Sequence, residues 1–330
     1  MYVRIKAHIK VERSDGSVIA FTGFNDVVIE RDLFKINTIC RLKMPLSVRL
    51  RNTKTGRIES VQSSTQFKRG DKISVQLGYD EDLVEEFTGY IYRINYAAPL
   101  EIECEGSEFL LRGPVATRTW SEVSIGNVLS YIIAGTGVVL RDDVPGMTFK
   151  NFVIGANLTR LEALQLVKDK YGLTVYFLKN QLYVGLAYSL NLGTVKYRLG
   201  FNTIVDNELK YRIAEDVQLK IKAVWIRPDN TKLEVEVGDS SGSQRTLFFY
   251  DVSSQEELKK IAKEEMQKYK YSGYEGKITT FLQPYAEPGY KAVLADDRFP
   301  ERAGNYYVTK TEVKVGTSGA RRIVEFSIKL

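Results

Sequence analysis

The chain has 330 residues, of which 44% are hydrophobic and 27% are charged, as is typical of soluble globular proteins. This length is enough for two or three domains, each with its own core. The formal net charge of +6 comes from Lys and Arg mixed with nearly as many Asp and Glu, which counts against a nucleic-acid groove and favours a solvated surface.

The N-terminal part of the chain, residues 1–106, has the pattern of short β-strands. Apolar and polar residues alternate from Val3 to Val11, and a turn at residues 14–17 precedes a further strand. The 20 Tyr and 15 Phe, against two Trp, also favour β structure. Six or more strands with regular turns and no helix signal predict a first antiparallel β-barrel module over residues 1–106.

Targeting segments and cysteine chemistry are not expected. The N-terminus lacks the apolar stretch of a signal peptide, and no segment reaches the roughly 18 apolar residues of a membrane span. Cys40 and Cys104 each lie in an apolar, strand-like setting. This setting favours two buried free thiols over a disulfide or a metal site.

Residues 107–192 combine helical and strand patterns. One apolar helical stripe covers residues 125–133, a second covers residues 161–171, and Gly172 follows the second as a stop signal. Both stripes are one-sided, so each helix is expected to lie on a sheet. Two short strands with a tight turn at Asn180 come next. Together these patterns predict a small α/β domain inserted into the β scaffold.

Strand patterns return over residues 193–330 and predict a second β-barrel module. Within it, residues 238–250 begin with a Gly- and Ser-rich stretch and predict a loop insertion. Ser254 with Glu257 forms a capping-box pattern that predicts a helix over residues 254–271. The expected fold class is therefore mainly β (α+β), with two related antiparallel β-barrel modules, an inserted small α/β domain and one helix in the second barrel region.

Two segments far apart in the chain resemble copies of one hairpin. Each begins at a Gly, continues as an alternating strand with a charged tip, and ends in a return strand that contains Gly and Tyr. An internal repeat of this kind predicts two related β modules in one chain. The residues that define the copies are Gly70, Asp71, Gly89 and Tyr90 in the first and Gly289, Gly304 and Tyr306 in the second.

No set of residues has the spacing of a catalytic or metal site. His8, the single histidine, lies on the polar face of a predicted strand without ligand partners at suitable spacing. The acidic clusters at residues 80–82, 85–86 and 296–297 fall at hairpin tips or edges, whereas a glycosidase needs two facing carboxylates. Ca²⁺ binding at these tips is a minor alternative. The sequence favours a structural protein over an enzyme, and no cofactor is expected.

A further set of short segments is spread along nearly the whole chain. Their order and spacing, more than any single motif, resemble those of a known protein family. The segments are Phe67–Tyr79, Phe87–Ile91, Ile102–Gly106, Leu110–Arg112, Leu161–Leu164, Tyr171–Leu173, Leu182–Gly185, Glu275–Thr279, Glu287–Gly289 and Gly304–Val308. They resemble the baseplate hub proteins of tailed bacteriophages. That family includes the late control protein D group, the Mu-type 43 kDa tail protein and the T4-type central hub, and it is similar to the hub part of type VI secretion spike proteins.

The resemblance implies a homotrimer around the tail axis, with two barrel-like modules per chain. Such a trimer would form a pseudo-hexameric ring that adapts the six-fold tail tube to the three-fold central spike. The implied partners are the spike, expected as a separate polypeptide, the tail tube and other baseplate or tape-measure proteins. DNA would pass through the central channel without specific binding.

The resemblance also implies a place in the virion tail baseplate, after assembly in the bacterial cytoplasm. Ring-forming segments are expected at residues 67–94 and 278–315. The seven residues that define the repeat are the candidate interface residues of this ring.

Three alternatives stay open. The first is a hub of a type VI-like or bacteriocin injection machine. The second is a glycan-processing tail enzyme, which would need a deep cleft with facing carboxylates. The third is a carbohydrate-binding adhesin with exposed aromatic residues, and burial of Trp120 and Trp225 in cores would count against it.

Overall fold

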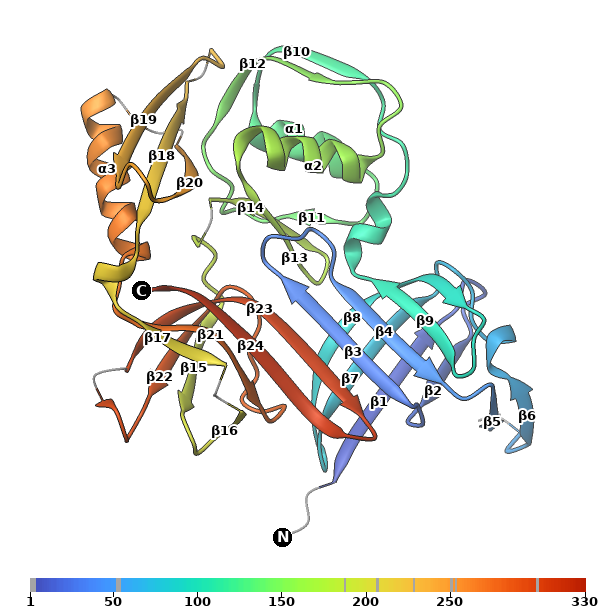
Figure 1. Cartoon of the computed structure of the whole chain (residues 1–330). Helices are drawn as coiled ribbons and strands as arrows, with labels where there is room; N and C mark the ends of the chain where they lie inside the picture. The colour runs from blue at the N-terminus through green and yellow to red at the C-terminus, as the bar shows by residue number, and fades with distance from the viewer. Residues whose placement is uncertain are drawn as a thin grey trace.

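The computed structural model describes residues 4–51, 55–186, 188–205, 208–227, 229–249, 252, 254–300 and 303–330. Two β regions lie side by side, and two smaller units that contain the helices lie against them (Figure 1). Strands dominate the described residues, which confirms a mainly β fold. Within the described ranges, no helix has the length and apolar character needed to cross a membrane.

The first β region is an antiparallel array in the order β3-β4-β9-β8-β7-β1-β2. Its strands are β1 (Ile5–Glu12), β2 (Val18–Phe21), β3 (Asp26–Asp32), β4 (Ile39–Met44), β7 (Lys72–Tyr79), β8 (Asp82–Asn95) and β9 (Leu100–Glu105). Beside it lies a separate hairpin of β5 (Ser47–Arg51) and β6 (Ile58–Gln62), followed by the short helix η1 (Ser63–Thr65). The predicted alternation in β1 is confirmed, because Ile9 and Val11 are buried while Lys10 is only half-buried.

The two cysteines are buried free thiols in this region, as predicted. They also lie directly opposite each other, because Cys40 of β4 is paired with Cys104 of β9. The hydrogen bond with Cys40, together with burial, raises the pKa of the Cys104 thiol well above its usual value. That thiol therefore stays neutral and packs as a small apolar side chain.

The inserted unit places two helices between two small sheets (Figure 1). Its elements are η2 (Ser107–Leu111), β10 (Arg118–Ser124), α1 (Ile125–Ile133), β11 (Val139–Leu140), β12 (Thr148–Ile154), α2 (Arg160–Tyr171), β13 (Thr174–Leu178) and β14 (Gln181–Gly185). Strand β10 pairs with β12, and the other three form a sheet in the order β11-β14-β13. Gly172 ends α2 with φ 62°, as predicted. The structure also shows a capping box of Thr159 and Glu162 at the start of α2.

The second β region follows the inserted unit and includes the C-terminus. Its elements are β15 (Gly193–Arg198), β16 (Thr203–Val205), β17 (Leu209–Arg212), η3 (Ala214–Asp216), β21 (Gly273–Thr280), β22 (Tyr290–Ala295), β23 (Gly304–Gly316) and β24 (Gly319–Lys329). Strands β16 and β17 pair with β21, which pairs with β24. Strand β24 pairs with β23, β23 with β22, and β22 with β15 in parallel.

The hairpin of β23 and β24 is shared by both β regions (Figure 1). The first part of β23 pairs with β22, whereas residues 310–316 pair with β3 of the first region. Val313 and Val315 pack in the first core, and Tyr306 and Val308 pack in the second. The pairings thus connect 14 strands into one sheet, with ends at β2, at β15, and at β16 and β17. Closure of the sheet into two barrels stays a prediction.

A second small unit interrupts the second β region. It consists of β18 (Leu219–Ile226), β19 (Lys232–Gly238), β20 (Ser243–Phe249) and α3 (Gln255–Tyr269). The three strands form their own sheet in the order β19-β18-β20, and α3 packs on it. The helix predicted over residues 254–271 is confirmed, with Ser254 as its N-cap.

The loop predicted over residues 238–250 is wrong in part, because Ser243–Phe249 form β20. This strand pairs in parallel with β18 along its whole length. Gly and Ser indicate only that the local backbone can adopt many conformations. Pairing with a distant strand depends on tertiary structure, so this composition does not reveal it. The proposed division of the chain into residues 1–106, 107–192 and 193–330 stays a prediction.

Candidate functional site: the paired hairpins and their charged junction

The two hairpins expected from the sequence are present and share a local geometry. The first is formed by β7 and β8, and the second by β22 and β23. Gly70 and Gly289, which precede the outgoing strands and are here called the leading glycines, both have φ 93°. The Gly70 N–H donates to the Ile91 carbonyl and the Gly289 N–H to the Val308 carbonyl, each at 2.9 Å. Glycine suits both positions because a side chain is strained at this φ.

Strand pairing aligns the return strands differently from the sequence comparison. Tyr90 pairs with Lys72, and Tyr307 pairs with Lys291, in each case the second residue after the leading glycine. Tyr90 therefore corresponds to Tyr307 and not to Tyr306. The repeat is recognised in the sequence from residue types, namely Gly and Tyr in each return strand. The register of a return strand is set instead by its hydrogen bonds to the neighbouring strand.

Two of the seven candidate interface residues are buried and bonded within their own chain. Asp71 is 2% exposed, and its carboxylate accepts hydrogen bonds from the backbone N–H groups of Ser14 (3.3 Å) and Lys68 (2.8 Å). Tyr306 is fully buried, and its hydroxyl accepts the N–H of Tyr274 at 2.9 Å. These side chains shape the hairpins and do not face a neighbouring molecule.

Two of the candidate glycines are also internal. A side chain at Gly89 would meet the carbonyl of Glu105, and one at Gly289 would meet the side chain of Leu190. Both residues allow close packing of the hairpin against its surroundings. The candidates that reach the surface at least in part are Gly70, Tyr90 and Gly304. An interface role for these three stays a prediction.

Sequence reasoning missed a buried cluster of charged side chains that joins the two hairpins. Arg322 of β24 is fully buried, and its guanidinium donates to Oε1 of Glu86 in β8 at 2.5 Å. It also donates to the carbonyls of Leu282 (3.0 and 3.1 Å) and Ala286 (3.0 Å). Charge-assisted hydrogen bonds of this kind are strong, and loss of one partner would leave the other charge buried and unpaired.

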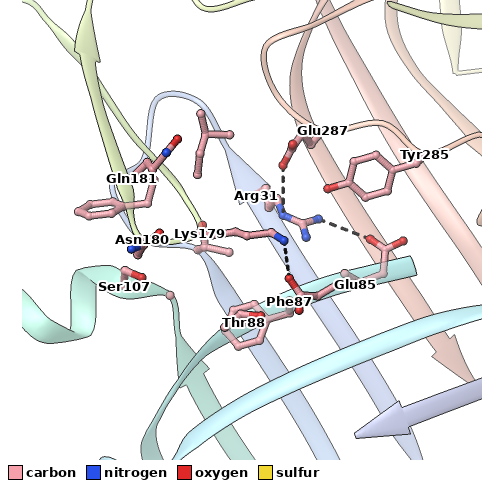
Figure 2. Close-up of a pocket in the computed structure, with 15 residues that line it drawn as sticks. Arg31, Glu85, Phe87, Thr88, Ser107, Lys179, Asn180, Gln181, Tyr285 and Glu287 are labelled. Carbon is pink, nitrogen blue, oxygen red and sulfur yellow. Dashed lines mark ion pairs between the residues drawn. The ribbon is translucent and has the colours of Figure 1, made fainter. Parts of the chain in front are cut away.

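A second arginine, Arg31 of β3, extends the cluster towards the second hairpin. Its Nη1 lies 3.7 Å from Oε2 of Glu86, and its Nε lies 4.0 Å from Oε2 of Glu287 (Figure 2). Burial raises the pKa of the Glu287 carboxyl above its usual value. The Arg322 guanidinium lies over the ring of Tyr285, 4.9 Å from its centroid. The cluster thus connects β3, β8 and β24 with the segment that leads into β22.

A cavity of about 400 Å³ lies beside this cluster, where the two β regions meet the inserted unit. Arg31 points towards Glu287 at this cavity, and the turn between β13 and β14 brings Lys179 and Asn180 to it (Figure 2). Lys179 Nζ lies 2.7 Å from Oε1 of Glu85, but the Lys179 side chain is 73% exposed. This exposed pair contributes little stability, so the buried cluster is the stronger connection.

Glu108 of η2 is a further buried carboxyl, at the start of the inserted unit. Its Oε1 accepts the N–H groups of Thr38 (2.6 Å) and Gly106 (2.9 Å), which flank β4 and β9. Burial is the largest influence and raises the pKa of Glu108 to about 8, although the two N–H donors lower it. This carboxyl is therefore mostly protonated at neutral pH.

The residues weighed for metal or acid–base chemistry do not come together. His8 is half-buried in β1 and pairs with Gln76 of β7. In the part of the chain that the structure describes, no group of three or more His, Cys, Asp or Glu could hold a metal ion. The buried charges lie at a junction of strands, and their arrangement fits a structural connection.

Solved structures with the same architecture come from phage tails. The 43 kDa tail protein of prophage MuSo2 from Shewanella oneidensis is 15% identical, with a TM-score of 0.60 and 97% of each chain covered. The tail protein from Neisseria meningitidis MC58 is 14% identical, with a TM-score of 0.59, and the match covers 98% of this chain and 96% of that one. The chain has the fold of phage tail proteins. The resemblance seen in the sequence is thus confirmed for the fold.

The fold is also similar to that of the E. coli c3393 protein, a component of a type VI secretion system. That protein is 9% identical, with a TM-score of 0.56, and the match covers 99% of this chain and 77% of that one. No family model matches the chain, and no curated protein matches it. At these identities the similarity establishes a shared fold and not a shared function.

Proposed function

We propose that the chain is a structural component of a phage or phage-like tail and forms a trimeric hub in the baseplate. Three chains would surround the tail axis, each with two related β regions joined by the hairpin of β23 and β24. The ring would then have six near-equivalent positions. Such a ring suits contact with a six-fold tail tube on one side and a three-fold spike on the other.

The repeated backbone geometry carries this proposal. Gly70 and Gly289 have the same φ and the same N–H bond to the return strand, and the two hairpins pair in the same register. Two hairpins with one backbone geometry can offer similar surfaces to two tube subunits. The shared strands, and the bond from Glu86 of the first hairpin to Arg322 of β24, would hold their spacing, as an adaptor between two symmetries requires.

The proposed partners follow from this arrangement. The spike and the tail tube would bind opposite faces of the ring, and other baseplate or tape-measure proteins would bind around or within it. The channel would let DNA pass without specific contacts. The protein would act in the virion tail after assembly in the bacterial cytoplasm.

The acidic tip of the second hairpin supports a structural role over an enzymatic one. Asp296 Oδ1 accepts the N–H groups of Arg298 (2.9 Å) and Phe299 (3.1 Å), and Asp297 pairs with Arg198 at 2.5 Å. These carboxylates stabilise their own turn. They do not form the facing pair that glycoside hydrolysis requires.

The two tryptophans are half-buried and meet only in part the burial that would count against a glycan-binding adhesin. Trp120 packs against Tyr131 and Phe152, with ring centroids 5.3 and 6.0 Å apart. Trp225 packs at the edge of the core between the β18 sheet and α3. Both indoles are half-buried against cores and do not form an open aromatic platform.

A hub of a type VI-like or bacteriocin injection machine is the second candidate. The structural similarity to a type VI secretion component over 99% of this chain favours it. The neighbouring genes distinguish the two candidates. A tape-measure gene upstream and a small spike gene downstream would indicate a phage tail.

The mass and shape of the purified full chain test the proposal. We expect a trimer with three times the 37.5 kDa mass of one chain, measured by light scattering. Negative-stain images should show a three-fold ring with a central opening. A chain that stays monomeric at every concentration, or forms only a two-fold dimer, would contradict the proposal.

A further inference from the structure

The continuous sheet ends at β2, at β15, and at β16 and β17. The β2 end and the β16–β17 end carry different chemistry. Strand β2 pairs only with β1, and β16 and β17 pair only with β21, in the part of the chain that the structure describes. These ends lie on opposite sides of the molecule (Figure 1). An unpaired sheet edge is a template for pairing with another chain, so each end needs a cover or a partner.

The β2 end borders a large groove with basic residues on its rim. The groove has a volume of about 1630 Å³ and lies between β2 and the hairpin of β5 and β6. Phe21, Phe24 and Val48 give it an apolar wall. Arg49 and Arg51 are exposed at its rim, and neither has an ion-pair partner among the described residues.

The opposite end of the sheet presents apolar side chains, one exposed lysine (Lys210 of β17) and, beyond β17, acidic side chains. We name residues 209–216, which include β17 and η3, the β17–η3 segment. Within it Tyr211 is 37% exposed and Ile213 is 48% exposed. Glu215 and Asp216 follow on the exposed helix η3 and have no ion pair within the described ranges. An apolar surface bordered by charge is typical of an interaction site.

We infer that the groove beside β2 binds the β17–η3 segment of a second copy of this chain. Tyr211 and Ile213 would enter the apolar groove, while Glu215 and Asp216 would face Arg49 and Arg51 at its rim. Two features favour the β17–η3 segment as the ligand of this groove. The charges of the two surfaces are complementary, and each surface has an unpaired strand edge.

This contact joins two different surfaces of the same chain, so it is heterologous. A heterologous contact forms a closed ring if its rotation closes, as the proposed trimer requires. The inference therefore rests on the proposed function and names the two surfaces that would build the ring. It also covers the β2 and β17 edges of the sheet in each subunit.

A charge-swap experiment on the full chain tests the contact. The double variant Arg49→Glu with Arg51→Glu should assemble about tenfold to hundredfold more weakly than the wild type, because like charges then meet. Glu215→Arg with Asp216→Arg should weaken assembly to a similar extent. The four substitutions combined should restore most of the assembly, as measured by light scattering over a concentration series.

Matched controls separate this contact from general effects of charge and folding. Lys259→Glu with Lys260→Glu makes the same charge change on exposed positions of α3 and should leave assembly unchanged. Circular dichroism should show that each variant melts as the wild type does. All four altered positions are exposed, so their substitution leaves the cores intact.

The outcomes separate failure of this contact from failure of the ring. If the wild type forms trimers and both reversed variants do so equally well, the named surfaces are wrong and the proposed ring stands. If each reversal weakens assembly but the combination does not recover it, the two surfaces do not meet. A wild type that never assembles overturns the ring and this contact together.

Discussion

The two hairpins share a backbone but differ in what surrounds it. In the first, Tyr90 is half-buried and stacks on Phe109, with ring centroids 5.4 Å apart. In the second, the corresponding Tyr307 is 3% exposed, and its hydroxyl donates to the Leu190 carbonyl at 2.6 Å. The second hairpin is thus enclosed by the chain returning from the inserted unit, whereas the first lies at the edge of that unit.

This difference shows that one backbone geometry can serve two environments. The leading glycine and the register define the path of each hairpin, while neighbouring elements decide how much change each position tolerates. The second hairpin is expected to be the more sensitive to substitution. The charged cluster that joins the hairpins should be the most sensitive part of all.

Loss of the buried bond between the first hairpin and β24 should have the largest effect. Glu86→Ala leaves the buried Arg322 guanidinium without its carboxylate and should lower the free energy of unfolding by about 3–5 kcal/mol. Urea denaturation measures this change. The neighbouring Glu85→Ala removes only the exposed pair with Lys179 and should cost less than about 1 kcal/mol. Equal costs for the two variants would show that the cluster does not join the hairpins as described.

The surroundings of the first hairpin should make stability depend on pH through Glu108. Its folded pKa of about 8 exceeds the ordinary value, so the stability it contributes is present at low pH and is lost as pH rises towards 8. Between pH 5 and 9 the free energy of unfolding of the wild type should fall by a few kcal/mol through this group. Each unit by which the folded pKa exceeds the unfolded value contributes on the order of 1.4 kcal/mol.

The variant Glu108→Gln resembles the protonated side chain and should lack this part of the pH dependence. Denaturation curves of the two proteins, recorded across the same pH range, provide the measurement. Parallel curves would show that Glu108 is not held protonated by burial.

The two leading glycines should differ in their response to alanine. The Cβ added by Gly70→Ala would have no neighbouring atom within 4 Å. This variant should therefore lower the free energy of unfolding only by the backbone strain of positive φ, about 1–2 kcal/mol. Gly289→Ala has the same strain, and its Cβ would also lie 2.9 Å from a side-chain carbon of Leu190. It should cost about 1–3 kcal/mol more than Gly70→Ala. Thermal unfolding of both variants checks the difference, and similar losses would argue against the enclosed setting of the second hairpin.

The smallest expected difference concerns the corresponding tyrosines. Tyr307→Phe leaves the Leu190 carbonyl without this donor and should cost about 1 kcal/mol, as expected for a buried hydrogen bond. Tyr90→Phe should be nearly neutral, because the ring stacking on Phe109 is kept. Chemical denaturation compares the two variants, and a larger loss for Tyr90→Phe would reverse the proposed order.

Local patterns in the sequence predicted much of the fold. The stripe of residues 161–171 predicted α2, and Gly172 marked its end, because both signals act within a few residues. The repeat predicted two hairpins and their leading glycines. The structure places Tyr307, and not the Tyr306 named for the second copy, at the position of Tyr90, because hydrogen bonds between strands and not residue types set that register.

The sequence could not predict the features that depend on distant segments. Strand β20 forms through a parallel ladder with β18. Its last three residues are apolar and suit a strand, but residues 243–246 are all polar and show no alternation that reveals one. The bond between Arg322 and Glu86 joins positions 236 residues apart. Charged residues are ordinarily assigned to the surface, so neither residue signalled a buried role.

The sequence by itself therefore determined the class of fold, the helices with their caps and the two repeated hairpins, because short-range sterics, capping and periodicity specify them. Only the tertiary structure decided that β23 and β24 join both regions in one sheet and that buried charges connect the hairpins. It also decided which side chains lie at the sheet ends. These features come from contacts between distant residues, and their free energy exists only once the whole chain has packed.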